Sequence, residues 1–198
     1  MSLKKLILSG IFTALTVLGA FIQIPLGDLP VTLQTFFVFM AGLMLEPRYA
    51  FLSQFAYMAA GLIGLPVFSK GGGFGYVLQP SFGFIVGFCV CAFLVSALAR
   101  KNLLAFFYGG RKTKPLLKAA GGMLLSVAAL YITGISYMYL IYNLYMAKQV
   151  SAGYLILNAA GIFFLIDTAK FVLAAPLCAA VLKRLPKGFI EPHLFERK

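Results

Sequence analysis

The feature that most constrains this chain is a succession of long apolar stretches with few charged side chains between them. Apolar residues make up 62% of the 198 positions and charged residues only 11%, whereas a soluble domain has about 25% charged residues. With 17 Lys and Arg and five Asp and Glu, a soluble body of this size could not cover its surface. The composition excludes an ordinary soluble domain and a disordered chain, and it predicts a polytopic membrane protein.

Short breaks rich in Pro, Gly or charged residues separate the apolar stretches from one another. A membrane-spanning helix needs about 20 residues, so six such helices use about 120 and leave only loops and tails. We therefore expect an all-α integral membrane protein, with residues 1–198 forming a single domain, a bundle of six transmembrane helices. The predicted spans are residues 6–24, 31–45, 49–65, 81–99, 116–146 and 154–182, of which the second is short and the fifth is longer than one crossing requires.

The cations are distributed unevenly along the chain. Fourteen of the 17 Lys and Arg lie at the N-terminus, around residue 48, between residues 100 and 118, or in the tail after residue 182. The opposite side holds only Lys70 and Lys148, and Lys170 lies inside the last span. By the positive-inside rule we expect a multi-pass protein of the bacterial cell membrane with both termini cytoplasmic. This accounts for the basic pI without a nucleic-acid partner, and the basic segments suit the anionic headgroups of the lipid bilayer.

Asp167 and Lys170 are the most informative pair of residues, because they lie in the middle of an apolar stretch. Each such charge costs about 2.5–3.5 kcal/mol at the centre of a membrane helix. At a spacing of three residues they share a helix face and can pair. The pair is interpreted as a substrate site facing the bundle interior, since a carboxylate accepts from an N–H while an ammonium donates to a carbonyl. The alternative is a structural ion pair that fixes helix packing.

A glycine-rich loop, residues 71–75, lies on the side opposite the termini. Apolar and aromatic residues bracket it, at 64–68 and 76–80. A solvated linker would be polar, so we expect this external loop to pack over a ligand site as a lid; a flexible linker is the alternative. The chain contains no Gly-Lys pair and therefore no Walker nucleotide-binding motif.

Thr32 and Gln34 follow Pro30, and their spacing in an extended segment puts both side chains on one face. The alternative is the solvated start of a helix. Gly10 and Ala14 form a step of small residues that lets two helices approach closely. Most of the tyrosines between residues 131 and 154 are interpreted as an interfacial aromatic belt.

Catalytic chemistry finds little support in the sequence. The single histidine, His193, lies in the tail, and Cys89, Cys91 and Cys178 lie in apolar stretches as small core residues. We expect no enzyme activity, no metal site and no cofactor.

Several segments, taken in order, resemble the biotin transporter BioY family. They are residues 30–34 (PVTLQ), residues 61–68 (GLIGLPVF), the triple glycine, residues 80–84 (PSFGF) followed by Gly87 and Phe88, and Asp167 with Lys170. The resemblance extends from Leu6 to Leu182. Members of this family are the substrate-binding (S) components of energy-coupling-factor transporters.

The resemblance implies a six-helix bundle that binds biotin from outside the cell. It also implies partners: a transmembrane coupling protein, on which a helix-one Ala-x-x-x-Ala step docks, and two cytoplasmic ATPases. Gly10 and Ala14 match that step. The family's Pro-Thr-x-Gly-Tyr element reads 80–84 here, which keeps a hydroxyl at Ser81 and replaces the tyrosine by Phe84. The expected substrate-binding residues are Asp167, Lys170, Thr32, Gln34, Gly72, Gly73, Tyr76 and Ser81. A related ligand such as lipoate, and the orientation of the ligand, remain open alternatives.

Overall fold

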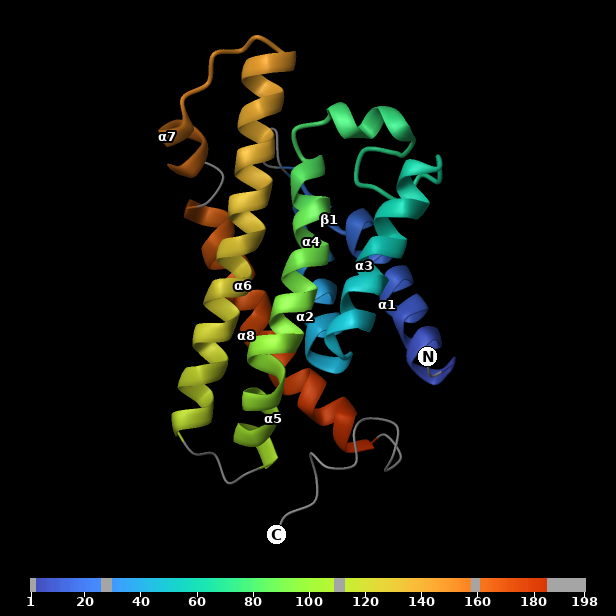
Figure 1. Cartoon of the computed structure of the whole chain (residues 1–198), viewed down its shortest axis with the longest axis vertical. Helices are drawn as coiled ribbons and strands as arrows, with labels where there is room; N and C mark the ends of the chain where they lie inside the picture. The colour runs from blue at the N-terminus through green and yellow to red at the C-terminus, as the bar shows by residue number, and fades with distance from the viewer. Residues whose placement is uncertain (1–2, 26–29, 109–112, 158–160, 185–198) are drawn as a thin grey trace.

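The long apolar stretches form helices that lie side by side along the long axis of the molecule (Figure 1). The computed structural model describes residues 3–25, 30–108, 113–157 and 161–184. The principal helices are α1 (Leu3–Phe21), α2 (Gln34–Met44), α3 (Pro47–Leu62), α4 (Phe82–Leu94), α6 (Thr113–Leu140) and α8 (Gly161–Arg184).

Two of these helices continue through π-helical segments. The segment η2 (Val95–Arg100) joins α4 to α5 (Lys101–Tyr108), and η3 (Ile141–Tyr145) extends α6. A 3-10 helix, η1 (Phe74–Leu78), precedes α4, and a single helical turn, α7 (Ala152–Leu155), precedes α8.

Some helices are shorter than the spans that the sequence predicts. Within the described residues, four helical stretches are long and apolar enough to cross a membrane: Leu3–Phe21, Phe82–Tyr108, Thr113–Tyr145 and Phe163–Arg184. The predicted span 31–45 is instead a two-residue strand followed by α2, whose 11 residues extend about 16 Å at 1.5 Å per residue. The predicted span 154–182 divides between α7 and α8. The count of six spanning helices therefore stays a prediction.

The short helix α2 is the centre of the bundle. Val38, Phe39 and Ala41 are fully buried, and the helix packs against α1, α3, α4 and α8 (Figure 1). A helix that is apolar on every side belongs in the interior of a protein. Because protein surrounds α2, its length need not match the thickness of a bilayer.

Hydrogen bonds along a polar seam join α1 to α3. The Ser9 hydroxyl donates to the Tyr49 carbonyl (3.2 Å), and the Thr13 hydroxyl donates to the Ser53 carbonyl (2.8 Å). Lys5 pairs with Glu46, the residue that precedes α3. Pro47 then occupies the first turn of α3, where its missing N–H costs no hydrogen bond.

A small antiparallel hairpin connects α1 to α2. Strand β1 (Gln23–Ile24) pairs with β2 (Val31–Thr32), with Gln23 opposite Thr32 and Ile24 opposite Val31. The Leu33 amide donates to the carbonyls of Gly19 (3.1 Å) and Ile22 (3.0 Å). These bonds hold the start of α2 against the end of α1, and they fix the position of the polar residues around β2.

Helices α4 and α6 approach each other closely at glycines. A Cβ atom added to Gly83 would lie 2.3 Å from Cβ of Tyr137, and one added to Gly134 would lie 2.5 Å from the ring of Phe84. Small residues at a helix interface are a common device in membrane bundles. Here they bring α6 near enough to α4 for both helices to line one cavity.

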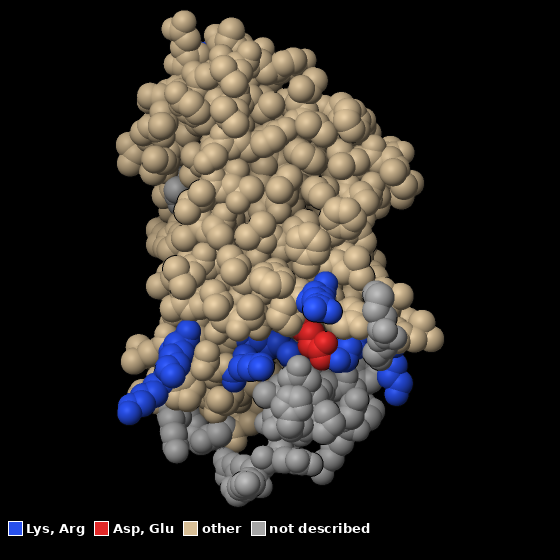
Figure 2. Space-filling view, viewed as in Figure 1, with Lys and Arg blue, Asp and Glu red and all other residues tan. Residues whose placement is uncertain are grey.

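The cationic side chains gather at one end of the molecule. On the face drawn in Figure 2, the Lys and Arg side chains form a band at the end that contains the beginning of α1 and the helix α5. The opposite half of this face shows almost no Lys, Arg, Asp or Glu among its described residues. The polarity matches the positive-inside pattern of the sequence.

Candidate ligand-binding site

A cavity lies in the half of the bundle away from the cationic band. It has a volume of about 630 Å³, counted with the space at its open mouth. Its walls come from the segment around β2, the outer ends of α3 and α4, the loop between them, the middle of α6, and α8. The lining residues are Pro30, Val31, Thr32, Gln34, Thr35, Tyr57, Ser69, Tyr76, Ser81, Phe84, Ile85, Phe88, Leu130, Tyr131, Phe163, Asp167 and Lys170.

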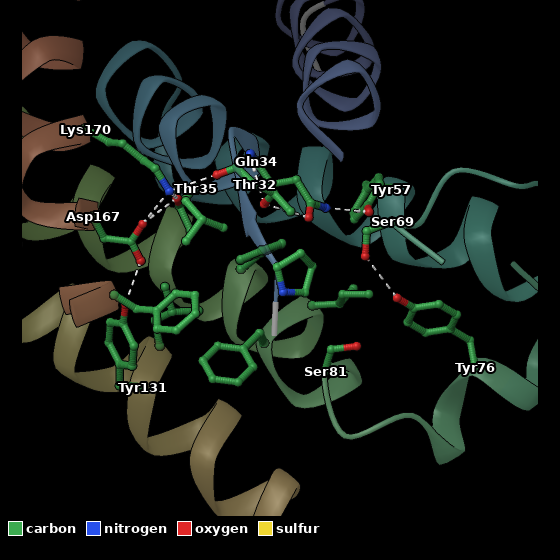
Figure 3. Close-up of a pocket in the computed structure, with 17 residues that line it drawn as sticks. Thr32, Gln34, Thr35, Tyr57, Ser69, Tyr76, Ser81, Tyr131, Asp167 and Lys170 are labelled. Carbon is green, nitrogen blue, oxygen red and sulfur yellow. Dashed lines mark hydrogen bonds and ion pairs between the residues drawn. The ribbon is translucent and has the colours of Figure 1, made fainter. Parts of the chain in front are cut away.

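Lys170 stands at the centre of a charged cluster on one side of this cavity (Figure 3). Its Nζ donates to Asp167 Oδ1, to the Thr35 hydroxyl and to the Thr32 carbonyl, each at 2.8 Å. An ammonium group has three donors, so these partners use all of them. The ammonium is thereby held in a fixed place.

The Asp167 carboxylate accepts hydrogen bonds from three side chains. Oδ1 accepts from the Thr35 hydroxyl (2.7 Å) and from Lys170, and Oδ2 accepts from the Tyr131 hydroxyl (2.8 Å). The two charged side chains are only 8% (Asp167) and 13% (Lys170) exposed. Because an ionised carboxylate offers about four acceptor sites, Oδ2 keeps room for one more donor.

A second network runs from the hairpin to α3. The Thr32 hydroxyl donates to Gln34 Oε1 (3.0 Å), and Gln34 Nε2 donates to the Tyr57 hydroxyl (2.6 Å). The Tyr57 hydroxyl in turn donates to the Val67 carbonyl (3.2 Å). Thr32 and Gln34 therefore lie together on the cavity wall, with Gln34 itself buried.

The opposite side of the cavity carries neutral polar groups. The hydroxyls of Ser69 and Tyr76 lie 3.3 Å apart, and Ser81 lies on the same side, away from the charged cluster (Figure 3). Figure 3 shows apolar side chains between the two polar sides, and the apolar lining of the cavity includes Phe84, Phe88 and Leu130. The cavity is thus polar at both sides and apolar in the middle.

The glycines of the predicted lid do not line the cavity. The Gly73 amide donates to the Gly61 carbonyl at the end of α3 (2.7 Å), and a Cβ atom added to Gly72 would lie 2.0 Å from the Leu65 carbonyl oxygen. Gly73 also has a positive φ of 100°, which glycine adopts without strain. These glycines let the loop fold tightly on α3, and Ser69 and Tyr76 are the loop side chains that reach the cavity.

Gly10 and Ala14 lie on the outer face of α1, remote from the cavity lining. Both residues are exposed, and a Cβ atom added to Gly10 would meet no atom within 4 Å. The step of small residues therefore faces outward from the described part of the chain.

The sequence interpretation missed several cavity residues: Thr35, Tyr57, Ser69, Tyr131 and the apolar lining. Tyr131 is only 7% exposed and binds Asp167. Its position near the middle of the apolar stretch 116–146 distinguishes it from a belt tyrosine, which lies near the end of a span. The sequence therefore contained a signal that Tyr131 faces the bundle interior. Thr35 carried no comparable signal.

No group of three or more His, Cys, Asp or Glu side chains is close enough to hold a metal ion in the part of the chain that the structure describes. Cys89, Cys91 and Cys178 are buried free thiols.

Comparison with known proteins gives a consistent result. The family model described as BioY family matches residues 1–187. A probable biotin transporter BioY of Lysinibacillus sphaericus is 51% identical over 94 residues, which is 48% of each chain. The biotin transporter BioY of Thermotoga maritima is 35% identical over 187 residues, covering 92% of this chain and 98% of the relative.

A solved structure has the same fold. It is the crystal structure of the S-component for biotin from an ECF-type ABC transporter, with a TM-score of 0.72 and 26% sequence identity. The alignment covers 93% of this chain and 96% of that one.

Proposed function

This chain belongs to the BioY family, and we propose that it is the biotin-binding subunit of a vitamin uptake transporter in the cell membrane. The observation that carries the proposal is the layout of the cavity: a charged cluster on one side, hydroxyls on the other, and apolar side chains between them. Biotin has the same order of groups, with a ureido ring, an apolar thioether ring and chain, and a carboxylate.

Within this proposal, Asp167 and Lys170 have different roles. Asp167 Oδ2 has an acceptor site left, so it accepts one ureido N–H. The donors of Lys170 are already taken by Asp167, Thr35 and the Thr32 carbonyl. Lys170 therefore acts as a positioning residue that holds the Asp167 carboxylate in its orientation, and it need not contact the ligand.

The hydroxyls across the cavity suit the other end of biotin. Ser69 and Tyr76 belong to the external loop and Ser81 follows it, and the three hydroxyls can donate hydrogen bonds to a carboxylate. The apolar lining, including Phe84, meets the thioether ring and the aliphatic chain. The absence of a tyrosine hydroxyl at Phe84 leaves Ser81 as the polar group of this element.

Lipoate, the alternative ligand, fits the charged cluster less well. Its dithiolane ring has no N–H donor, so a lipoate ring placed against Asp167 would donate no hydrogen bond to the carboxylate. The remaining acceptor site of Asp167 Oδ2 would then be shielded from water without gaining a donor, which costs free energy. We therefore assign biotin rather than lipoate.

The topology and the partners form part of the same proposal. Six helices are embedded in the membrane: α1, α2, α3, the continuous α4–α5 unit, α6 and α8. The cationic band and both termini lie on the cytoplasmic side. The outward face of α1 at Gly10 and Ala14 docks on a transmembrane coupling protein that works with two ATPases. The proposed role is transport, without a catalytic step or a cofactor.

Mass spectrometry of the ligand that co-purifies with the protein tests this function, followed by calorimetric titration with biotin and with lipoate in detergent. We expect biotin in the purified protein and a clear preference for biotin in the titration. Tighter binding of lipoate, or no measurable binding of biotin by well-folded protein, would overturn the assignment.

A further inference from the structure

A second hollow lies on the outer wall of the bundle, between α3 and α4. Arg48, Phe51, Val90 and Phe93 line it, and it is separate from the ligand cavity. Arg48 is in the first turn of α3, next to the Lys5–Glu46 ion pair. The hollow therefore lies at the cationic end of the molecule, where the bundle meets the membrane–water interface.

The walls of this groove are apolar and open to the surroundings. Phe51, Val90 and Phe93 are 41%, 36% and 40% exposed. The ring of Phe51 stacks on that of Phe55, also exposed, with the centroids 6.0 Å apart and an interplanar angle of 14°. Phe55 lies one turn further along α3, toward the middle of the bundle, so the apolar surface continues away from Arg48.

Arg48 supplies a positive charge at the cytoplasmic end of this apolar surface. It is exposed, and within the described residues no ion pair includes it; Glu46, the nearest acid in sequence, pairs with Lys5. The positive end of the α3 dipole lies at the same place. Lys101, the first residue of α5, is a second exposed cation beyond the cytoplasmic end of α4.

We propose that this groove binds one anionic phospholipid from the cytoplasmic leaflet. Arg48 holds the phosphate through its planar fork of N–H donors, and Lys101 adds attraction from the neighbouring helix. One acyl chain lies in the groove against Phe51, Val90 and Phe93. The occupant is a lipid because the groove combines an interfacial cation with an apolar surface that runs from it toward the bilayer centre.

The test uses the whole chain, purified and stripped of lipid in detergent. Phosphatidylglycerol and phosphatidylcholine with identical acyl chains are titrated separately, and native mass spectrometry counts the bound lipid. We expect one tight site that prefers phosphatidylglycerol. Arg48→Gln should weaken phosphatidylglycerol binding by about tenfold or more, because a charge-assisted hydrogen bond is lost. It should weaken phosphatidylcholine binding less, because the choline ammonium offsets the phosphate charge, so the preference for phosphatidylglycerol should decrease.

Two further variants make the result decisive. Lys118→Gln removes an exposed cation of α6 outside the groove, and it should keep the lipid preference. Val90→Trp fills the groove without changing the charge, and it should weaken binding of phosphatidylglycerol. Circular dichroism and size-exclusion chromatography establish that each variant is folded.

Equal binding of the two lipids by the unaltered protein would overturn the proposal, as would an unchanged lipid preference in Arg48→Gln. If Arg48→Gln keeps its affinity for phosphatidylglycerol but fails to assemble with other transporter subunits, the groove is a protein interface, and the lipid assignment is equally wrong.

Discussion

Among the described residues, two lysine–carboxylate pairs lie in very different surroundings, one in the wall of the ligand cavity and one near the cationic band. Lys170 and Asp167 are about nine-tenths buried, and their hydrogen bonds to Thr35, Tyr131 and the backbone form a closed network. Lys5 and Glu46 are 33% and 27% exposed and lie among other cations near the interface. Water and ions can replace either partner of the exposed pair, but only protein groups or a ligand can replace a partner of the buried one.

The buried pair should give the largest effect when it is broken. Asp167→Asn leaves Lys170 without a counter-ion, which typically costs about 3–5 kcal/mol of stability. It also removes a charge-assisted hydrogen bond worth about 1.5–3 kcal/mol. We expect biotin affinity to fall by about one to two orders of magnitude, measured by calorimetry in detergent alongside thermal unfolding.

The double variant Asp167→Asn with Lys170→Met separates folding from binding. It removes the unpaired charge, so it should recover expression but not biotin affinity. Full affinity in a well-folded double variant would mean that the pair serves only helix packing.

Ala14→Trp tests a part of the molecule that is remote from both pairs. A bulky side chain on the outer face of α1 should prevent docking and abolish biotin uptake by cells, while biotin affinity in detergent stays unchanged. Ala128→Trp is the matched control, because Ala128 is also exposed, on α6. Loss of biotin binding in folded Ala14→Trp protein would contradict the separation of docking from binding.

Tyr131→Phe should give an intermediate effect on biotin affinity. It removes the hydroxyl that orients Asp167 Oδ2 and leaves the ring in place against Phe84. We expect biotin affinity to fall by about tenfold, the value of one hydrogen bond to a charged group. Tyr139→Phe, on the exposed end of α6, serves as the control and should bind biotin normally.

The exposed pair should give the smallest effect. Glu46→Gln removes its acid, and pairs of this kind contribute about 0–1 kcal/mol. We expect a small change in the unfolding midpoint that decreases further in high salt, with biotin affinity unchanged. A destabilisation as large as that of Asp167→Asn would show that exposure does not distinguish the two pairs.

The same contrast explains what the sequence could predict. Charges in an apolar stretch are rare, so Asp167 and Lys170 were visible as a candidate site and as a pair, which the structure contains. Thr35 and Tyr131 are common residue types in membrane helices. Their role depends on a three-dimensional contact with α8 across more than 30 positions of sequence, and no local pattern encodes that contact.

Some features of the fold could be predicted from the sequence and others could not. The helical class and the membrane character follow from composition, and the family relationship supports both. The length of α2 cannot be predicted from the sequence, because an apolar stretch has the same residue pattern whether lipid or protein surrounds it. The substrate-binding role predicted for Gly72 and Gly73 stays a prediction; in the structure the missing side chain of Gly72 and the positive φ of Gly73 let the loop fold on α3.

The hairpin between α1 and α2 has a thermodynamic consequence. The Leu33 amide is bonded to the end of α1, while its neighbours Thr32 and Gln34 form part of the cavity wall. In the proposed transporter, this connection is a structural route by which occupancy of the cavity would affect the α1 docking face. Whatever factor a bound coupling protein applies to the dissociation constant of biotin, biotin must apply to that of the coupling protein. In the proposed transporter, one coupling free energy would therefore set both the change in biotin affinity on docking and the change in docking affinity on biotin binding.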